Sequence, residues 1–317
     1  MNETLKVLLT DHPWPETDIE RTILAAAGLE LTEPRHRGNM QELVALAHGA
    51  AAILTCWAPV PAEMIADNAG LRLVARLGVG VDNIDLASAR ANGVLVTNVP
   101  DYCVEEVSDH VLALVHAWAR GIVSYDRDVH AGRWEPAARV LRRVSSLKVG
   151  VVGLGRIGSR VAEKFQALGA AVVGSDPHGR ARSGHVQIVA QNHLLEAVDV
   201  VTVHVPLNKA THHLVDHDFL SQMCDGSLLV NTSRGPVIDT QSLLDALALG
   251  RPGAAALDVV EGEPAVPAEL LKRSNVILTP HVSFSSDRSI AELRTRASEE
   301  VVRVLSGGRP LHGVPAN

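Results

Sequence analysis

Three polar residues with complementary chemistry stand in the C-terminal part of the chain: Arg234, Glu263 and His281. A histidine exchanges protons near neutral pH, a neighbouring carboxylate can orient the ring and stabilise its charged form, and a guanidinium can hold an anion through two parallel hydrogen bonds. Reduction of a 2-keto acid needs this set, because the developing alkoxide must receive a proton while the substrate carboxylate is held. We therefore expect His281 to be the acid/base, Glu263 its partner and Arg234 the anchor.

A glycine-rich turn precedes these residues along the chain. A G-x-G-x-x-G motif at 153–158 follows the apolar run 148–152 and opens a helical stretch. In this context the motif binds a dinucleotide, because the glycines let the backbone approach the pyrophosphate at a helix N-terminus. The alternative interpretation is a sharp strand-to-helix turn without a ligand. The expected cofactor contacts in the turn are Gly153, Gly155, Arg156, Ile157 and Gly158.

The next apolar run, 171–174, leads to Asp176. A carboxylate at this place can accept hydrogen bonds from the adenosine ribose and would repel the additional phosphate of NADP. We therefore expect the cofactor to be NAD. Arg180 and Arg182 keep NADP open, because a cationic side chain could hold that phosphate.

Two further groups of polar residues have ambiguous patterns. Asp258 ends a predicted strand, where it could hydrogen-bond the nicotinamide amide or simply cap the strand end. His212, His213 and His217 suggest a metal, since His213 and His217 lie four apart on a possible helix. No third ligand is evident in the sequence, so we expect no metal and interpret these histidines as polar residues at a helix entry.

The elements that must position these residues form two series of alternating strands and helices. The first series has apolar runs at 7–9, 52–54, 71–76 and 93–97, with amphipathic stretches at 19–27 and 43–47. The second has apolar runs at 148–152, 171–174, 200–203, 227–230, 254–257 and 276–279. Both series predict parallel sheets, so the fold class should be α/β, with a Rossmann domain in the second series.

Helical periodicity predicts two further elements. Apolar residues recur at helical spacing over 104–122, which predicts a long helix bridging the domains after the breaker Asn98-Val99-Pro100. The amphipathic segment 289–305 predicts a helix that returns to cover the first domain.

Composition limits the classes of protein to which the chain can belong. Its 317 residues can build two cores, and its hydrophobic and charged fractions, 46% and 21%, are those of a soluble globular protein. With no membrane-length apolar run and no secretory signal, we expect a cytoplasmic protein. A net charge of -7 opposes nucleic-acid binding. Cys56, Cys103 and Cys224 are too few and scattered for a disulfide framework or a zinc motif, so buried thiols are expected.

Together these motifs closely resemble the D-isomer-specific 2-hydroxyacid dehydrogenase family. The matching stretches are Gly78–Asp85, Val152–Gly158, Val230–Gly235, Ala256–Val259 with Glu263-Pro264, and Thr279-Pro280-His281. The resemblance implies that Arg234, Glu263 and His281 are catalytic and that the product is a D-hydroxy acid. It also implies a substrate loop whose backbone amides meet the substrate carboxylate, formed by Leu77, Gly78, Val79 and Gly80.

The family's fold implies a discontinuous, smaller, flavodoxin-like substrate domain made from both chain ends. On this chain it would comprise residues 1–99 and 288–317, and residues 100–287 would form the NAD-binding Rossmann domain. The resemblance also implies a homodimer formed through the cofactor domain. We further expect cofactor contacts from His204, Pro206, Thr232, Ser233, Asp258 and His281.

Two departures from the family pattern resemble the C-terminal-binding-protein subgroup. Val104 stands where many members carry Thr or Ser, and the usual small residues after His281 are replaced by Val282-Ser283-Phe284-Ser285-Ser286. In that subgroup an aromatic residue at the position of Phe284 lines the substrate pocket. The alternative is that Phe284 is a packed residue beside the hinge.

The sequence therefore predicts an NAD-dependent D-2-hydroxyacid dehydrogenase acting on a small 2-keto or 2-hydroxy acid. The alternative is an NAD(H)-sensing binding module or co-repressor with little turnover, which the subgroup resemblance suggests. The substrate side chain is not predicted, because it depends on how the loops near Trp57, Tyr102 and Phe284 shape the pocket.

Overall fold

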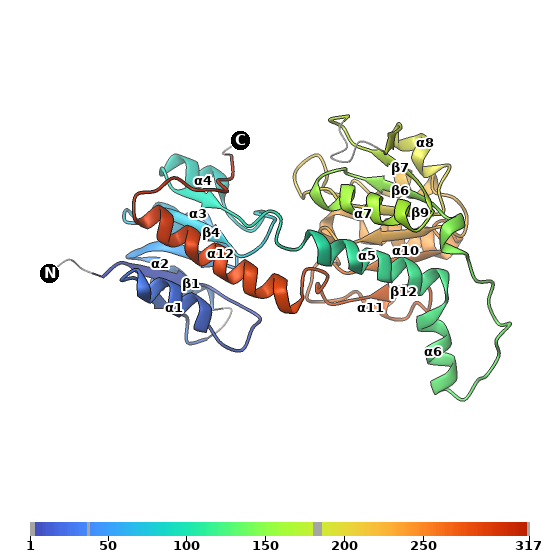
Figure 1. The fold of residues 1–317 in the computed structure, drawn as a ribbon, viewed down its shortest axis with the longest axis horizontal. Helices are drawn as coiled ribbons and strands as arrows, with labels where there is room; N and C mark the ends of the chain where they lie inside the picture. Colours follow the sequence, from blue (N-terminus) through green and yellow to red (C-terminus); the bar gives the residue numbers. More distant parts are fainter. Residues whose placement is uncertain (1–3, 37–38, 180–185, 316–317) are drawn as a thin grey trace. The chain divides into compact units, whose positions relative to one another are not determined.

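The computed structural model describes residues 4–36, 39–179 and 186–315. The chain forms two compact units: unit 1 comprises Met1–Tyr102 and Ser286–Asn317, and unit 2 comprises Cys103–Ser285. Each unit is an α/β structure with a parallel sheet and helices packed against it (Figure 1). Both units therefore belong to the predicted fold class.

The sheet of unit 1 has the strand order β2-β1-β3-β4-β5, and all its neighbours are parallel. This is the flavodoxin-like doubly wound order. Its central strand, β3, is buried along its whole length, which explains its unbroken apolar sequence. The elements are β1 (Lys6–Leu9), α1 (Asp18–Ala26), β2 (Glu30–Thr32), α2 (Met40–Ala47), β3 (Ala50–Thr55), α3 (Ala62–Ala66), β4 (Leu73–Arg76), α4 (Leu86–Ala91), β5 (Leu95–Thr97) and α12 (Asp287–Leu305).

The last helix, α12, completes unit 1 from the far end of the chain. Ser286 begins the helix with a capping box, in which its side chain accepts from the Ser289 N–H while the Ser289 side chain accepts from the Ser286 N–H. The helix contacts α1, β3 and β4, and Figure 1 shows it in red beside the blue α1. Its apolar face is thus buried on unit 1, as its amphipathic sequence predicts.

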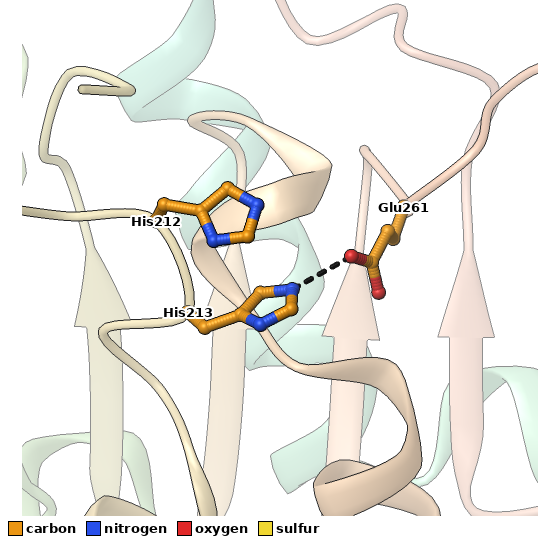
Figure 2. A group of neighbouring side chains, drawn as sticks. All are labelled: His212, His213 and Glu261. Carbon is orange, nitrogen blue, oxygen red and sulfur yellow. Dashed lines mark hydrogen bonds and ion pairs between the residues drawn. The ribbon is translucent and has the colours of Figure 1, made fainter. Parts of the chain in front are cut away.

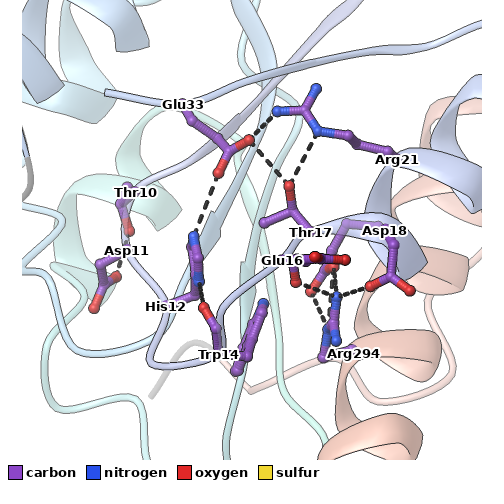
Figure 3. A network of polar contacts seen from close by, with 11 residues as sticks. Thr10, Asp11, His12, Trp14, Glu16, Thr17, Asp18, Arg21, Glu33 and Arg294 are labelled. Atoms are coloured by element: carbon purple, nitrogen blue, oxygen red, sulfur yellow. Dashed lines mark hydrogen bonds and ion pairs between the residues drawn. The ribbon is translucent and has the colours of Figure 1, made fainter. Parts of the chain in front are cut away.

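A buried ion pair links α12 to α1 (Figure 3). Arg294 donates from Nε to both carboxylate oxygens of Glu20 at 2.9 and 3.1 Å, and from Nη2 to the Asp18 carboxylate at 2.8 Å. The same Nη2 donates to the carbonyl of Glu16, and the guanidinium lies 5.1 Å from the ring centroid of Trp14. Every partner lies near the start of α1, so this arginine fixes the helix entry against α12.

Unit 2 contains a seven-stranded parallel sheet in the order β12-β11-β10-β9-β6-β7-β8. This is the Rossmann order with one additional strand. Alternate residues of β9 enter the two cores on either side of the sheet: Val200 faces one, and Val201 and Val203 face the other. The elements are α5 (Val104–Ala119), α6 (Ile122–His130), η1 (Val144–Ser146), β6 (Lys148–Val152), α7 (Arg156–Ala167), β7 (Ala171–Ser175), β8 (Gln187–Ile188), α8 (Gln191–Leu195), β9 (Val200–Val203), α9 (His217–Ser221), β10 (Leu228–Asn231), η2 (Gly235–Val237), α10 (Thr240–Leu249), β11 (Ala254–Leu257), α11 (Ala268–Leu271) and β12 (Val276–Leu278).

The helix expected over 104–122 is shorter than predicted. It ends at Ala119, and Gly121 adopts a left-handed φ of 63° before a second helix, α6, begins. The helix contacts α7 and β10, so it is an integral part of unit 2. Glycine readily adopts the left-handed conformation that ends a helix, so the helix ends before Gly121 although apolar residues continue beyond it.

Composition gave one expectation about the cysteines and one about membrane-spanning helices. Cys56 and Cys103 are buried, whereas Cys224 is only partly buried, and all three are free thiols. None of the helices in the described part of the chain combines the length and hydrophobicity that a bilayer-spanning segment needs.

Candidate active site

Three neighbouring strands of unit 2 end beside one another and carry the three candidate catalytic residues. Arg234 follows β10, Glu263 lies in the loop after β11, and His281 follows β12. The strands are adjacent and parallel, so these loops leave the same edge of the sheet. The glycine-rich turn after β6 leaves that edge as well, because β6 belongs to the same parallel sheet. The topology therefore collects the predicted site residues of unit 2 at one edge.

His281 and Glu263 form a direct hydrogen bond. Nδ1 of His281 lies 2.6 Å from Oε1 of Glu263, and both side chains are partly exposed. His281 has a left-handed φ of 51°, and its backbone N–H donates to the Asp258 carbonyl at 2.7 Å. The carboxylate fixes the tautomer and plane of the ring, so Nε2 is the nitrogen directed away from Glu263.

Asp258 shapes the turn that presents His281. One carboxylate oxygen accepts from the Thr279 hydroxyl at 2.5 Å and the Val282 N–H at 3.0 Å, and the other accepts from the Ser283 N–H at 2.9 Å. Burial raises the pKa of Asp258, but these hydrogen bonds outweigh it and leave the pKa below its usual value. The side chain is thus a buried anion at the base of the turn.

Loop contacts join the segment carrying Arg234 to the segment carrying Glu263. A Cβ on Gly235 would lie 2.1 Å from the Val260 carbonyl oxygen, so only glycine allows this approach. The Asn231 amide donates to the Arg234 carbonyl at 2.9 Å, and its oxygen accepts from the Ser233 N–H at 2.9 Å. The Arg234 guanidinium itself donates to the Ser233 carbonyl at 2.9 Å. These contacts therefore fix the position of the loop that carries Arg234 relative to the loop that carries Glu263.

The glycine-rich turn has the shape that a dinucleotide requires. A Cβ on Gly158 would lie 1.9 Å from the Gly153 carbonyl oxygen, which enforces the close strand–helix packing. A Cβ on Gly155 would meet nothing within 4 Å, so the N-terminus of α7 faces open space. Asp176 accepts from the Leu154 N–H at 2.9 Å and therefore lies beside the turn. Arg180 and Arg182 lie outside the described residues.

Two polar side chains lie near this edge of the sheet. The Thr232 hydroxyl is buried and has no hydrogen-bond partner among the residues that the structure describes. Burial lowers the pKa of His204 to about 3, so its ring is neutral, and its Nε2 lies 2.8 Å from the Thr202 hydroxyl. An unused buried hydroxyl costs free energy unless a ligand or water satisfies it. The open helix N-terminus and this hydroxyl together fit a bound dinucleotide.

The remaining expected contacts have local partners. Ser233 donates its hydroxyl to the Asn231 amide oxygen at 2.7 Å. The Pro206 carbonyl accepts from Thr211 at 2.5 Å. Phe284 meets the His281 ring edge-on, with 6.1 Å between the ring centroids.

The predicted substrate loop belongs to unit 1, where it follows β4. The Gly78 carbonyl accepts from the Val99 N–H at 3.0 Å, and the Val79 carbonyl accepts from the Asn98 amide at 2.6 Å. These two contacts use carbonyl groups, whereas the Leu77 N–H donates to the Thr55 carbonyl at 2.8 Å. Leu77 and Gly78 are buried, whereas Val79 and Gly80 are partly exposed.

The histidine group at 212–217 differs from its sequence-based interpretation. Helix α9 begins at His217, so His213 and His217 do not share a helix face. His213 instead has a left-handed φ of 52° and places Nε2 2.7 Å from Oε1 of Glu261 (Figure 2). Glu261, which the sequence did not indicate as a third ligand, lies beside His212 and His213. The contact spans 48 residues, and no local sequence pattern marks it.

Sequence reasoning also missed the residues that support the site. Asn231 shapes the Arg234 loop, and Thr279 bridges Asp258 to His110, whose Nε2 lies 3.0 Å from the threonine hydroxyl. Asn231 and Thr279 lie inside matched motifs, and their strand-end positions are the signal that could have identified them. His110 lies on α5 and carries no such signal.

Comparison with known proteins gives consistent matches. A family model described as D-isomer specific 2-hydroxyacid dehydrogenase, NAD binding domain, matches residues 112–283. A glyoxylate reductase of Korarchaeum cryptofilum is 36% identical over 260 residues, covering 80% of this chain and 78% of that protein. A D-3-phosphoglycerate dehydrogenase of Archaeoglobus fulgidus is 38% identical over 252 residues, covering 78% of this chain and 48% of that protein. The chain thus spans about half the length of the phosphoglycerate dehydrogenases that it matches.

Solved structures match nearly the whole chain. The D-lactate dehydrogenase of Aquifex aeolicus, solved with NAD and lactic acid, has a TM-score of 0.86 at 28% identity and covers 95% of this chain and 96% of its own. The NADPH-dependent glyoxylate/hydroxypyruvate reductase of Sinorhizobium meliloti, solved with NADP and malonate, has a TM-score of 0.89 at 28% identity and covers 99% and 98%. Proteins of this fold therefore include both NAD and NADP complexes.

Proposed function

The chain belongs to the D-isomer-specific 2-hydroxyacid dehydrogenase family, and from this premise we propose that it catalyses the reversible reduction of a small 2-keto acid to a D-2-hydroxy acid. The observation that carries the proposal is the 2.6 Å hydrogen bond between His281 and Glu263 at the sheet edge where the glycine-rich turn also opens. The bound nicotinamide would supply the hydride to the 2-keto carbon.

The proton would come from His281. In the reductive direction, Nε2 gives its proton to the carbonyl oxygen as the hydride reaches the carbon, and in the oxidative direction it takes that proton back. Glu263 holds Nδ1 and offsets the positive charge of the imidazolium. The balance is one 2-keto acid, one NADH and one proton converted to one 2-hydroxy acid and one NAD⁺.

Arg234 and the unit 1 loop would orient the substrate. The planar guanidinium of Arg234 can hold the carboxylate and the carbonyl oxygen. The loop from Leu77 to Gly80 would add the backbone N–H groups of Gly78, Val79 and Gly80 to the same carboxylate, while the Leu77 N–H holds the loop to the Thr55 carbonyl. Phe284, which meets the His281 ring, would line the space for the substrate side chain. We also propose similarity to the C-terminal-binding-protein subgroup, on the basis of the run of residues after His281.

The cofactor proposal is NAD, because Asp176 places a carboxylate beside the glycine-rich turn. We also assign Asp258 to the nicotinamide amide, because it follows β11 at the sheet edge where the glycine-rich turn opens. The proposed cofactor contacts are Gly153, Gly155, Arg156, Ile157, Gly158, Asp176, His204, Pro206, Thr232, Ser233, Asp258 and His281.

We assign cofactor binding to unit 2 and most substrate contacts to unit 1, with boundaries near residues 99 and 287. A cytoplasmic homodimer formed through unit 2 completes the proposal. Four exposed apolar side chains between residues 122 and 140 of unit 2 support it, because exposed apolar surface favours subunit contact. The side chains are Ile122, Val129, Trp134 and Val140.

The test is NADH oxidation followed by absorbance with glyoxylate, hydroxypyruvate, pyruvate and a bulky aliphatic 2-keto acid. We expect saturable turnover with at least one acid, and faster turnover with NADH than with NADPH. Tight NADH binding without turnover of any acid, with either cofactor, would contradict the proposal and favour a cofactor-sensing module.

A further inference from the structure

A second polar cluster of unit 2 lies outside the proposed catalytic residues. It consists of His212 and His213, from the loop between β9 and α9, and Glu261, from the loop after β11 (Figure 2). The two imidazole rings are adjacent, with 4.0 Å between their centroids, and His213 bonds to Glu261. Two loops that are distant in sequence thus bring two imidazoles and a carboxylate together.

The ligand set and spacing match a site for a transition-metal ion. One donor atom from each residue lies within 4.8 Å of the others. Donors at about 2.1 Å from a tetrahedral ion lie roughly 3.4 Å apart, so His212 must approach the other two donors and the 2.7 Å between His213 and Glu261 must widen. His212 is exposed and can make this movement by rotating its side chain. Two histidines and a glutamate with one position left for water are a common zinc ligand set.

The residues behind the cluster already hold its ligands in orientation. Nδ1 of His213 lies 3.4 Å from a carboxylate oxygen of Asp239. The second oxygen of Glu261 accepts from the Thr240 hydroxyl at 2.9 Å and from its N–H at 3.3 Å. A metal-bound histidine usually donates its other ring N–H to a carboxylate, and ligating carboxylates are themselves hydrogen-bonded. The hydrogen-bonded carboxylate is present here, and Asp239 lies within ion-pair distance of the second nitrogen of the His213 ring.

We propose that His212, His213 and Glu261 bind a divalent transition-metal ion, with Zn²⁺ the best match to two imidazoles and one carboxylate. Nε2 of His213 and Oε1 of Glu261 turn from each other to the ion, and Asp239 retains the Nδ1 proton of His213. The ion joins the loop after β9 to the loop that also carries Glu263, two residues beyond Glu261.

The cluster has one competing explanation. The alternative is that the His213–Glu261 bond only ties the two loops together, and under that explanation His212 has no role.

The test is titration of the untagged protein with Zn²⁺ in competition with a zinc-binding dye. The wild type should bind one equivalent that His212→Ala removes. Glu261→Gln should remove the same equivalent. Asp239→Asn should weaken binding by about 10–100-fold, the usual effect of losing such a support, while its amide can still cap α10. His217→Ala, in an exposed histidine at the start of α9, is the matched control and should bind as the wild type does.

Two results would overturn the proposal. One is a wild type that takes up no Zn²⁺ in competition with the dye, and the other is equal uptake by the wild type and His212→Ala, which would show adventitious binding elsewhere. Zn²⁺ should also raise the melting temperature of the wild type but not of His212→Ala, because a ligand stabilises the state that binds it. Neither measurement depends on turnover, so failure here leaves the dehydrogenase proposal untouched.

Discussion

Two hydrogen-bonded acid–base pairs, one in each unit, differ in how far they are buried. In unit 1, Arg294 and Glu20 have side-chain exposures of 9% and 0%, and the arginine is also held by Asp18 and Trp14. In unit 2, His281 and Glu263 have exposures of 23% and 36%. The first pair is almost entirely buried, whereas the second keeps part of its surface exposed to solvent. The buried pair of unit 1 therefore fixes two helices against each other, whereas the partly exposed pair of unit 2 can exchange a proton.

The physical reason lies in the cost of breaking each pair. Loss of one partner of a buried pair leaves a charge without water or a counterion, which costs several kcal/mol of folding free energy. A partly exposed histidine loses less, because water can replace its partner, and it can reach a substrate. The comparison predicts large effects on stability in unit 1 and on turnover in unit 2.

The largest effect is expected for His281→Asn. Asparagine tolerates the left-handed backbone at this position but cannot act as an acid at neutral pH. Turnover with the best 2-keto acid should fall by about 10²–10⁴-fold, the usual contribution of a general acid. Steady-state kinetics measure the fall, and NADH fluorescence should show that cofactor binding persists.

Glu263→Gln refines the same test. Glutamine can still hydrogen-bond Nδ1 but cannot offset the charge of the imidazolium, so the fall in turnover should be smaller than for His281→Asn. His217→Ala serves as the control for loss of a histidine. Wild-type turnover in His281→Asn would contradict the assignment of the acid.

The second effect is on stability in unit 1. Glu20→Ala should lower the free energy of unfolding by about 3–5 kcal/mol, because it leaves Arg294 buried with only the more exposed Asp18 as counterion. Urea denaturation followed by circular dichroism measures the change. Arg21→Ala is the matched control on the same helix, since its pair with Glu33 is half exposed and should contribute about 0–1 kcal/mol. Equal losses in the two variants would refute the distinction by burial.

The smallest effect is the pH-dependent contribution of the Asp258 carboxylate to the free energy of unfolding. The folded protein lowers the pKa of this group, so its contribution to stability is complete above the unfolded pKa of about 3.9 and is lost as the pH falls through the folded value. Asp258→Asn should be less stable than the wild type at neutral pH, and the two unfolding free energies should converge below about pH 4. Parallel curves over this range would show that the carboxylate charge contributes nothing.

Much of the fold follows from local patterns in the sequence. The strand before the glycine-rich turn and the helix after it were predicted because β6, the turn and α7 are continuous in the chain. The apolar runs of β9, β10 and β11 are buried on both faces, so the sequence marks them clearly. By contrast, β2 has no fully buried residue and β8 has two exposed residues, so neither leaves a hydrophobic signal.

The site was predictable to the extent that its residues lie at strand ends. Arg234 and His281 each lie three residues beyond the end of a strand of one sheet, and Glu263 lies in the loop between two strands of that sheet. The approach of Glu261 to His213 was not predictable, because it depends on a left-handed backbone at the histidine and on a contact across 48 residues. The support of Asp258 by Thr279 likewise arises only when the turn closes.

The return of α12 to unit 1 has a consequence for the order in which the chain can fold during synthesis. The residues up to Tyr102 leave the ribosome first, but the helix that covers α1, β3 and β4 is translated only after all of Cys103–Ser285. Unit 2 is continuous and can close while the earlier segment still exposes the apolar surface that α12 will cover. The nascent N-terminal segment must therefore stay protected from aggregation until translation reaches Leu305.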